Sequence, residues 1–424
     1  MSLFRRPLSI LALGTFTLAG CAPDPGVDDP AYEDGADGKA DGIGGEEDPS
    51  IIVARASRRL SSNLPASDVG KTFMVDDEHM PYADTFWPYS DPNSAEGTGR
   101  LDNGIDATFD GPDSPLTKYM KLADAAKLGE AKAWEKTNHG SGVSGVASWF
   151  GHCPGWTAAA LLNRLPSGPI SAKLSGATPV ACSAGSAGCV TFKVADLTAL
   201  LAEVYLDAPS AFLGARCDTA PGDIKRDEAG RILNPGCEGT NPATVMVVAN
   251  AMIKKQHRGF AIDAQRRDKT DQIWNQPAFA YTVSKAEVLT EAQAAQLVLK
   301  KDDYASINGK ARGWVRVTMS VDWATEPTNG HPEQKPAPES SDTHRFEMVL
   351  ELDRPVTDLA KPGTANLIGG EYLDDDAAGA NRLDVFPFMW TPRGPGHDDA
   401  SGSADGHNPY VKTALVQQLV ALAK

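Results

Sequence analysis

The first 21 residues constrain this chain most, because they decide the compartment in which the rest of it folds. Two arginines precede an apolar run from Leu8 to Leu18, and a small Ala-Gly pair stands directly before Cys21. This order is typical of an export signal, and a cysteine after the small pair predicts lipidation. The run is shorter than the roughly 20 residues that span a bilayer. We expect residues 1–20 to be a signal peptide; an ordinary signal cleaved near an incidental cysteine is the alternative.

Lipidation of Cys21 would hold the mature protein at a membrane, since two or more acyl chains give stable anchoring. Ala22 and Pro23 follow the cysteine and carry no acidic retention signal. We therefore expect a lipid-anchored protein of the cell envelope, with the outer membrane favoured. Residues 21–50 contain ten acidic residues and one lysine, a composition that buries too little apolar surface to fold. They predict a flexible acidic tether, which leaves residues 51–424 as the folded part.

The composition of the folded part excludes some partners. The whole chain has a net charge of −16, and no basic stripe marks a nucleic-acid surface. The histidines lie apart without metal-ligand spacing, and no glycine-rich phosphate loop is present, so we expect no metal and no required cofactor. A weak calcium candidate is the acidic loop whose oxygen ligands would be Asp398, Asp399, Ser401, Ser403 and Asp405. A solvated acidic loop is the preferred interpretation.

The cysteine count is informative in an oxidising compartment. Lipidation of Cys21 leaves Cys153, Cys182, Cys189, Cys217 and Cys237. An odd number means that at least one thiol is free or paired between molecules. The favoured pairs are Cys182–Cys189 and Cys217–Cys237, since each would close a local polar loop; other pairings remain open.

With these pairs Cys153 is the cysteine left over, and its neighbours suggest a function. It precedes Pro154 and an Ala/Leu run, and proline is favoured at the first position of a helix. A cysteine at a helix start is stabilised as a thiolate. Trp149 and Trp156 are candidates to wall a dry slot, and Gly151 would leave room for a substrate backbone. A buried structural cysteine is the alternative.

A second segment follows this helix in the chain. Residues 241–250 and 259–263 are rich in β-branched and apolar residues, with a polar turn through Lys254, Lys255 and His257 between them. This pattern predicts a β-hairpin. Further on, residues 314–323 and 346–352 alternate apolar and polar side chains, which predicts an antiparallel sheet in the carboxyl third. Residues 326–341 form a Pro-rich loop, and Asn408-Pro409 would begin a last helix that runs to about Leu422.

Four segments together resemble a known family. Ile273-Trp274-Asn275-Gln276-Pro277 is similar to the core of the surface peptide of the transglutaminase elicitor family, the cell-wall transglutaminases of oomycetes and their bacterial relatives. Residues 86–89 with 114–119 resemble its amino-terminal aromatic-proline segment and short helix. Residues 151–156 resemble its nucleophile motif, and residues 369–372 its late strand pair. The resemblance covers most of residues 75 to 420.

This resemblance implies an α+β, papain-like or transglutaminase-like fold in which a nucleophilic cysteine at a helix start packs on an antiparallel sheet. It implies protein-glutamine gamma-glutamyltransferase activity, in which Cys153 forms a thioester with a glutamine side chain and an amine resolves it. The partners would be glutamine- and lysine-bearing proteins or amines of the envelope. Asp263 is the candidate acid that orients a base, with a surface-turn aspartate as the alternative.

The catalytic base is where the sequence departs from the family. The resemblance places the family's histidine at Met246, which has no titratable proton. The predicted hairpin would set Met246 opposite Asp263, so we expect a slow or inactive enzyme. His257 is the alternative base; His152 adjoins Cys153 but is expected to point elsewhere.

Other functions use the same residues. A papain-like cysteine hydrolase or deamidase differs only in using water, and an inactive surface protein would display the fold for binding. A thiol-redox protein ranks last, because the cysteine pairs lack the two-residue spacing of a redox motif.

Overall fold

The structure is a computed structural model of the chain. It describes residues 43–87, 89, 113–139, 150–215, 219, 223–227, 232–234, 237, 239–264, 273–299, 304, 307–325, 334–373, 386–398 and 406–424. Cys21, Trp149, Cys217 and most of the predicted calcium loop lie outside these residues. In the part of the chain that the structure describes, no helix combines the length and apolarity that crossing a membrane requires.

The protein is built from helices and antiparallel strands. The helices are α1 (Leu60–Asn63), α3 (Pro115–Ala123), α4 (Leu128–Asn138), α5 (Cys153–Leu162), α6 (Val194–Val204), α7 (Pro242–Ala249), α8 (Glu291–Leu299) and α9 (Thr413–Ala421). The strands are β1 (Thr72–Met74), β2 (Tyr82–Ala83), β3 (Ile170–Ser175), β4 (Thr178–Ala181), β5 (Val190–Phe192), β6 (Ser210–Gly214), β7 (Phe260–Asp263), β8 (Asn275–Leu289), β9 (Gly313–Ala324), β10 (Lys335–Pro336), β11 (Ser341–Leu352), β12 (Leu367–Leu373) and β13 (Phe388–Pro392).

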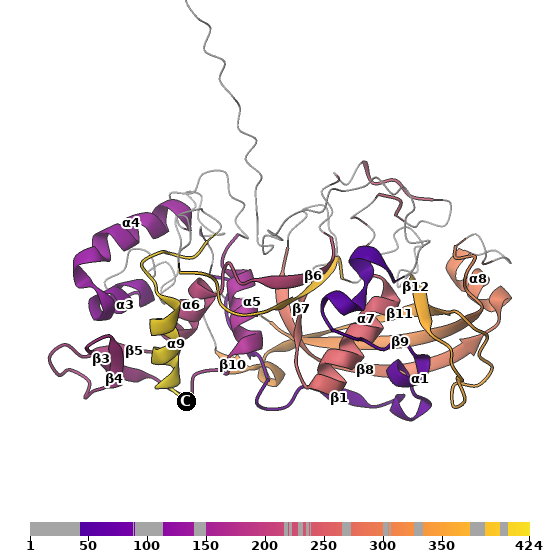
Figure 1. The fold of residues 1–424 in the computed structure, drawn as a ribbon, viewed down its shortest axis with the longest axis horizontal. Coiled ribbons are helices and arrows are strands. Elements are labelled where there is room, and N and C mark those ends of the chain that lie inside the picture. Colours follow the sequence, from indigo (N-terminus) through magenta and orange to yellow (C-terminus); the bar gives the residue numbers. More distant parts are fainter. Residues whose placement is uncertain are drawn as a thin grey trace, which may run out of the picture.

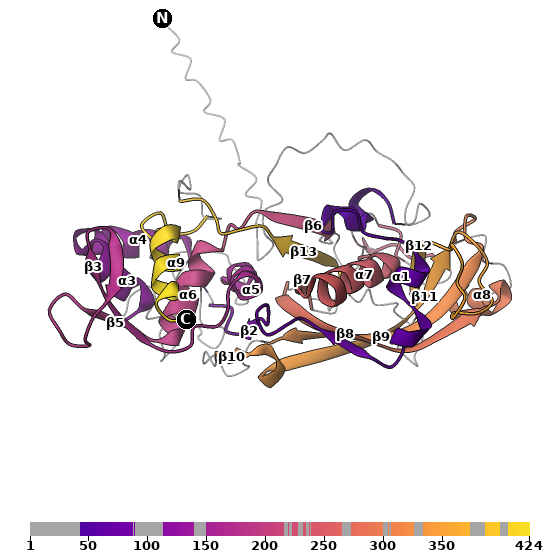
Figure 2. The same cartoon turned by 60° about the horizontal axis from the view of Figure 1, so that its bottom comes forward.

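The main sheet runs in the order β12-β11-β9-β8-β7-β13-β6, and β1 pairs with β8 outside this order. Its neighbouring strands are antiparallel. The sheet curls around α7, and a large apolar core fills the space between them (Figures 1 and 2). The α+β class and the antiparallel carboxyl third predicted from residues 314–323 and 346–352 are confirmed by β9 and β11.

The other end of the molecule is mostly helical. Helices α3, α6 and α9 pack around a second core beside the small sheet β4-β3-β5 (Figure 1). Helix α5 lies between the two ends and packs against both α6 and the strands β7, β8 and β13. Helix α5 begins at Cys153, which confirms the predicted helix start. Cys153 thus lies where the helical end meets the main sheet.

The predicted hairpin is wrong in its first segment and right in its second. Strand β7 exists as predicted, but residues 242–249 form helix α7, which a π-helix (Asn250–Lys255) continues. Asn241 caps the helix by accepting the Ala243 N–H at 2.9 Å, and Pro242 occupies the first turn. Every residue of α7 is buried. A helix buried on all sides shows no helical periodicity, so its β-branched residues imitate a buried strand.

Three predicted boundaries also change. The acidic tether ends earlier than residue 50, because residues 45–51 form two short 3-10 helices and Glu47 accepts the Asn241 N–H. The Pro-rich loop contains β10, which pairs with β2. The last helix begins at Thr413 rather than after Asn408, whose Oδ1 instead accepts the Tyr410 N–H in a local turn.

Candidate active site

Cys153 is the first residue of α5 and is almost completely buried, with 1% of its surface exposed. It belongs to no disulfide. Pro154 follows it in the first turn, as the sequence predicted, and residues 153–160 are all buried. The backbone N–H groups and the dipole at a helix start stabilise a negative charge there. The helix start therefore counteracts the cost of burying a thiolate at this position.

The side chain of Asn275 faces this thiol. Its Nδ2 donates toward Cys153 Sγ at 3.7 Å, while its Oδ1 accepts the Trp390 indole N–H at 2.8 Å. Its backbone carbonyl accepts the Thr157 hydroxyl of α5 at 2.8 Å. These two bonds fix both the strand and the amide orientation, so that the NH₂ group points at the sulfur. An amide N–H held in this way can stabilise developing negative charge beside the thiol.

Asp263 lies in the adjacent strand. It ends β7 and stands in register with Asn275 of β8. The side chain is 3% exposed, and its carboxylate accepts the Trp274 N–H at 3.0 Å. Asp263 is therefore no surface-turn residue, and the sheet brings it next to the residue that contacts Cys153.

Of the two tryptophans predicted to wall the site, the structure describes one. Trp156 is fully buried and donates its indole N–H to the Tyr82 carbonyl at 3.2 Å, in a cluster with Trp87 that is separate from the core of Cys153. Trp149 lies outside the described residues. Instead, Trp274 flanks Asn275 in the chain, and its ring meets Phe86 edge-on at 5.6 Å.

Gly151 does not leave room for a substrate, contrary to prediction. A Cβ added there would lie 2.4 Å from the Phe86 carbonyl oxygen and 2.7 Å from that of Trp87. The glycine is needed because two backbone segments cross closely at this point.

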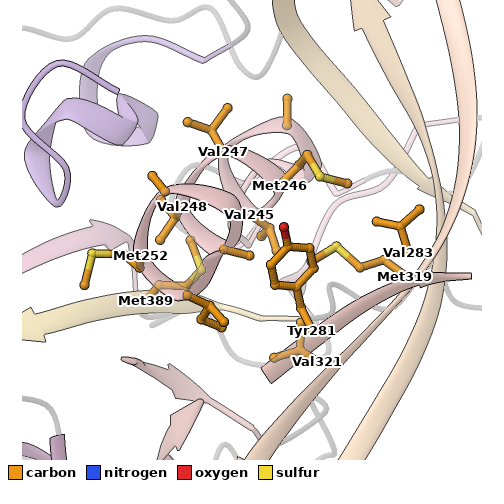
Figure 3. Packing of buried hydrophobic residues seen from close by; sticks show 14 of the residues in the cluster. Val245, Met246, Val247, Val248, Met252, Tyr281, Val283, Met319, Val321 and Met389 are labelled. Carbon is orange, nitrogen blue, oxygen red and sulfur yellow. The ribbon is translucent and has the colours of Figure 1, made fainter. Parts of the chain in front are cut away.

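The predicted position of Met246 is wrong. Met246 is fully buried in α7 and lies in the apolar core with Tyr281, Val283 and Met319 (Figure 3). Asp263 pairs with Asn275 instead, so position 246 is not opposite the acid. His257 is exposed after the π-helix with a φ of 56°, at the predicted turn. Neither residue is placed by the structure beside Cys153.

His152 points away from the thiol, as predicted, into a buried polar cluster that the sequence did not predict. Its Nε2 lies 2.8 Å from Glu203 Oε2, and Glu135 and His139 complete the group. Burial raises the pKa of Glu203, but His152 and His139 outweigh it and hold that pKa at about 2. The missed signal was the spacing of Glu135 and His139, which puts them on one face of a helix.

The cysteine pairing agrees with prediction where it is described. Cys182 and Cys189 form a disulfide, and Cys237 is also disulfide-bonded, while Cys217 lies outside the described residues. Asp398, from the acidic loop that was only a weak calcium candidate, accepts the Thr413 N–H at the start of α9.

The chain was compared with known proteins. The family model described as "Transglutaminase elicitor" matches residues 113–405, which is more than half of the chain. The chain belongs to the transglutaminase elicitor family. This family assignment agrees with the resemblance seen in the sequence. None of the curated proteins compared with the chain matches it.

The fold is also similar to that of a solved relative. The crystal structure of the GP42 transglutaminase from Phytophthora sojae matches with a TM-score of 0.55 and 18% sequence identity, over 87% of this chain and 98% of that chain. At this identity the likeness supports the fold alone. The family motif and the site meet at Asn275, because the Trp-Asn-Gln-Pro segment that carries the family resemblance also supplies the amide that faces Cys153.

Proposed function

We propose that this protein is a protein-glutamine gamma-glutamyltransferase with Cys153 as its nucleophile. The observation that carries the proposal is the pairing of a buried thiol at the start of α5 with the Asn275 amide of the family motif, 3.7 Å away. Family membership supports transglutaminase-like chemistry. A papain-like relation between a cysteine helix and a sheet that carries an acid is consistent with Asp263 on β7.

In the proposed reaction, the Cys153 thiolate attacks the carbonyl carbon of a glutamine side chain. The C–N bond breaks, ammonia leaves with a proton, and an acyl thioester remains on the sulfur. A primary amine then attacks the thioester carbon, loses a proton, and releases the thiolate as an isopeptide bond forms. The start of α5 and the Asn275 NH₂ group would stabilise the oxyanion of both tetrahedral intermediates.

The proposed role of Asp263 is to place a carboxyl group beside Asn275 and to orient a base. Neither Met246 nor His257 suits that role, because Met246 is in the core and His257 is exposed at the turn. A cysteine hydrolase or deamidase would use the same thiol with water as the second substrate. The burial of Cys153 favours transfer, because water that reaches a thioester hydrolyses it.

The proposed setting is the cell envelope. The export signal and Cys21 support a lipid-anchored protein, with the acidic segment before residue 43 as its tether. Proteins or amines of the envelope that bear glutamine and lysine would be the substrates.

The test is incorporation of a fluorescent primary amine into a glutamine-containing acceptor protein. Cys153→Ala should reduce incorporation to the level without enzyme, because no other nucleophile forms the thioester. Its thermal transition should move little, since the substitution removes only one sulfur atom. The matched control is the double variant Cys182→Ala/Cys189→Ala, which removes two other cysteines. This variant should keep its activity although it lacks the Cys182–Cys189 disulfide. Full activity in Cys153→Ala would refute the proposal.

A further inference from the structure

The cluster that contains His152 is built like a metal site. Glu135 and His139 come from the end of α4, His152 precedes α5, and Glu203 belongs to α6. Each residue is at least nine-tenths buried. One ligand atom from each side chain lies within 4.8 Å of all the others. Helices that are far apart in the sequence therefore bring four metal-binding groups to one point.

The distances in the cluster suit a tetrahedral ion. His139 Nδ1 lies 3.1 Å from Glu135 Oε1 and 3.7 Å from Glu203 Oε1. His152 Nε2 lies 2.8 Å from Glu203 Oε2 and 3.8 Å from Glu135 Oε1. Bonds of about 2.0–2.2 Å to a tetrahedral Zn²⁺ set neighbouring ligand atoms roughly 3.3–3.6 Å apart. The four observed separations run from 2.8 to 3.8 Å, which is from about 0.5 Å below that range to about 0.2 Å above it, and the two to Glu203 involve different carboxylate oxygens. Small movements of these side chains would bring one atom of each residue to the distances of a bound ion.

Groups around the cluster orient its ligands in the way that metal sites require. His152 Nδ1 lies 3.2 Å from the Trp87 carbonyl oxygen, so it donates there and leaves Nε2 with a lone pair toward the cluster. Asn408 holds both carboxylates, since its Nδ2 donates to Glu135 Oε2 at 2.7 Å and its backbone N–H to Glu203 Oε1 at 2.5 Å. Such second contacts fix ring tautomers and carboxylate directions at bound metals.

The charge of the cluster also favours a cation. Two buried carboxylates require two positive charges. Without an ion, His152 and His139 supply the positive charge that lowers the Glu203 pKa, although their ring centroids lie only 4.9 Å apart and like charges that close repel. One divalent ion supplies the same charge at the centre and leaves both rings neutral, which is the form that binds metal.

We propose that Glu135, His139, His152 and Glu203 bind a divalent first-row transition-metal ion, with Zn²⁺ the expected occupant. Two imidazoles select such ions over Ca²⁺ and Mg²⁺, which take oxygen ligands. Four protein ligands make a closed, structural site. The ion would join α4 and α6 to the residue that precedes Cys153, and so hold the start of α5 in place. The site does not depend on the proposed activity.

The test uses the full chain with Cys153→Ala, so that the thiol cannot bind metal itself. After chelation and dialysis, this protein should take up about one equivalent of Zn²⁺, and its thermal transition should rise, because an ion that binds only the folded state stabilises it. Co²⁺ should give the visible spectrum of tetrahedral coordination. Ca²⁺ and Mg²⁺ should raise the transition far less.

Variants locate the ion. Glu135→Gln keeps the size of the side chain and should weaken Zn²⁺ binding about 100-fold; His139→Ala should abolish it. His79→Ala, which removes a partly exposed histidine paired with Asp76, is the matched control and should leave binding unchanged. Absence of Zn²⁺ uptake by the parent protein, an octahedral Co²⁺ spectrum, or binding that survives His139→Ala would each overturn the proposal.

Discussion

Helices α5 and α7 look alike in sequence but differ in what their first residue does. Both start beside a proline and are buried along nearly their whole length. The cap of α7 is Asn241, whose side chain accepts an N–H of its own helix, whereas His152 before α5 makes no such capping bond and points into a polar cluster. Helix α5 thus begins on a reactive residue faced by Asn275. An apolar helix sequence predicts that the helix is buried. Whether the residue at its start can react depends on the strand that faces its first turn.

The largest effect should come from inserting a base into the wrong helix. Met246→His would put an imidazole into the apolar core of α7, which costs about 3–5 kcal/mol of stability through lost packing and an unpaired polar group. We expect no gain in amine incorporation, because position 246 is not beside Cys153 or Asp263. Urea unfolding and the amine assay measure the two effects. Met246→Leu should cost less than about 1.5 kcal/mol; a more active Met246→His enzyme would show that this comparison of the helices is wrong.

A somewhat smaller effect is expected at the residue that faces α5. Asn275→Ala removes the proposed oxyanion donor and should lower kcat about 100- to 1,000-fold with little change in KM. Asn275→Asp keeps an acceptor for Trp390 but adds a negative charge beside the thiol, which raises the thiol pKa. Its pH profile of kcat/KM should therefore shift to higher pH. Activity within a few-fold of wild type in Asn275→Ala would remove this residue from the mechanism.

Met246 and Asn275 also show how much of the fold and of the site the sequence could predict. The alternating strands β9 and β11 and the start of α5 were predictable, because each depends on local periodicity or on one proline. Helix α7 was not, since burial on every side removes the periodic signal. Asn275 was recognised as part of a family motif, but its role depends on the pairing of β7 with β8 and on Trp390, far along the chain. Long-range pairing of this kind has no local signature.

A third difference between the surroundings of the two helices is a buried acid near α5. Burial raises the pKa of Asp84 to about 6, although hydrogen bonds from Gln334 and Thr85 oppose the shift. The folded pKa exceeds the ordinary value of 3.8, so Asp84 favours folding most at low pH, and this contribution is lost as pH rises through about 6. The loss amounts to about 3 kcal/mol.

Asp84→Asn should abolish this pH-dependent loss. Between pH 4 and 7 (roughly the range between the two pKa values), the stability of the variant relative to wild type should rise by up to about 3 kcal/mol, as followed by urea unfolding. The control is Asp77→Asn, because Asp77 is exposed, and it should track wild type. Parallel curves for Asp84→Asn and wild type would mean that Asp84 does not titrate in this window.

The smallest effect should come from one N–H group. Trp390→Phe keeps an aromatic ring in the core but removes the donor that fixes the Asn275 amide. The amide can then rotate away from the sulfur, so kcat should fall about tenfold, equivalent to about 1.4 kcal/mol, with KM nearly unchanged. The matched control is Trp314→Phe at the far end of the main sheet, where the buried indole N–H has no hydrogen-bond partner among the described residues. That variant should keep full activity. If both variants lose activity equally, the effect reflects ring packing rather than the orientation of Asn275. The Trp390–Asn275 hydrogen bond would then not contribute to the chemistry at the start of α5.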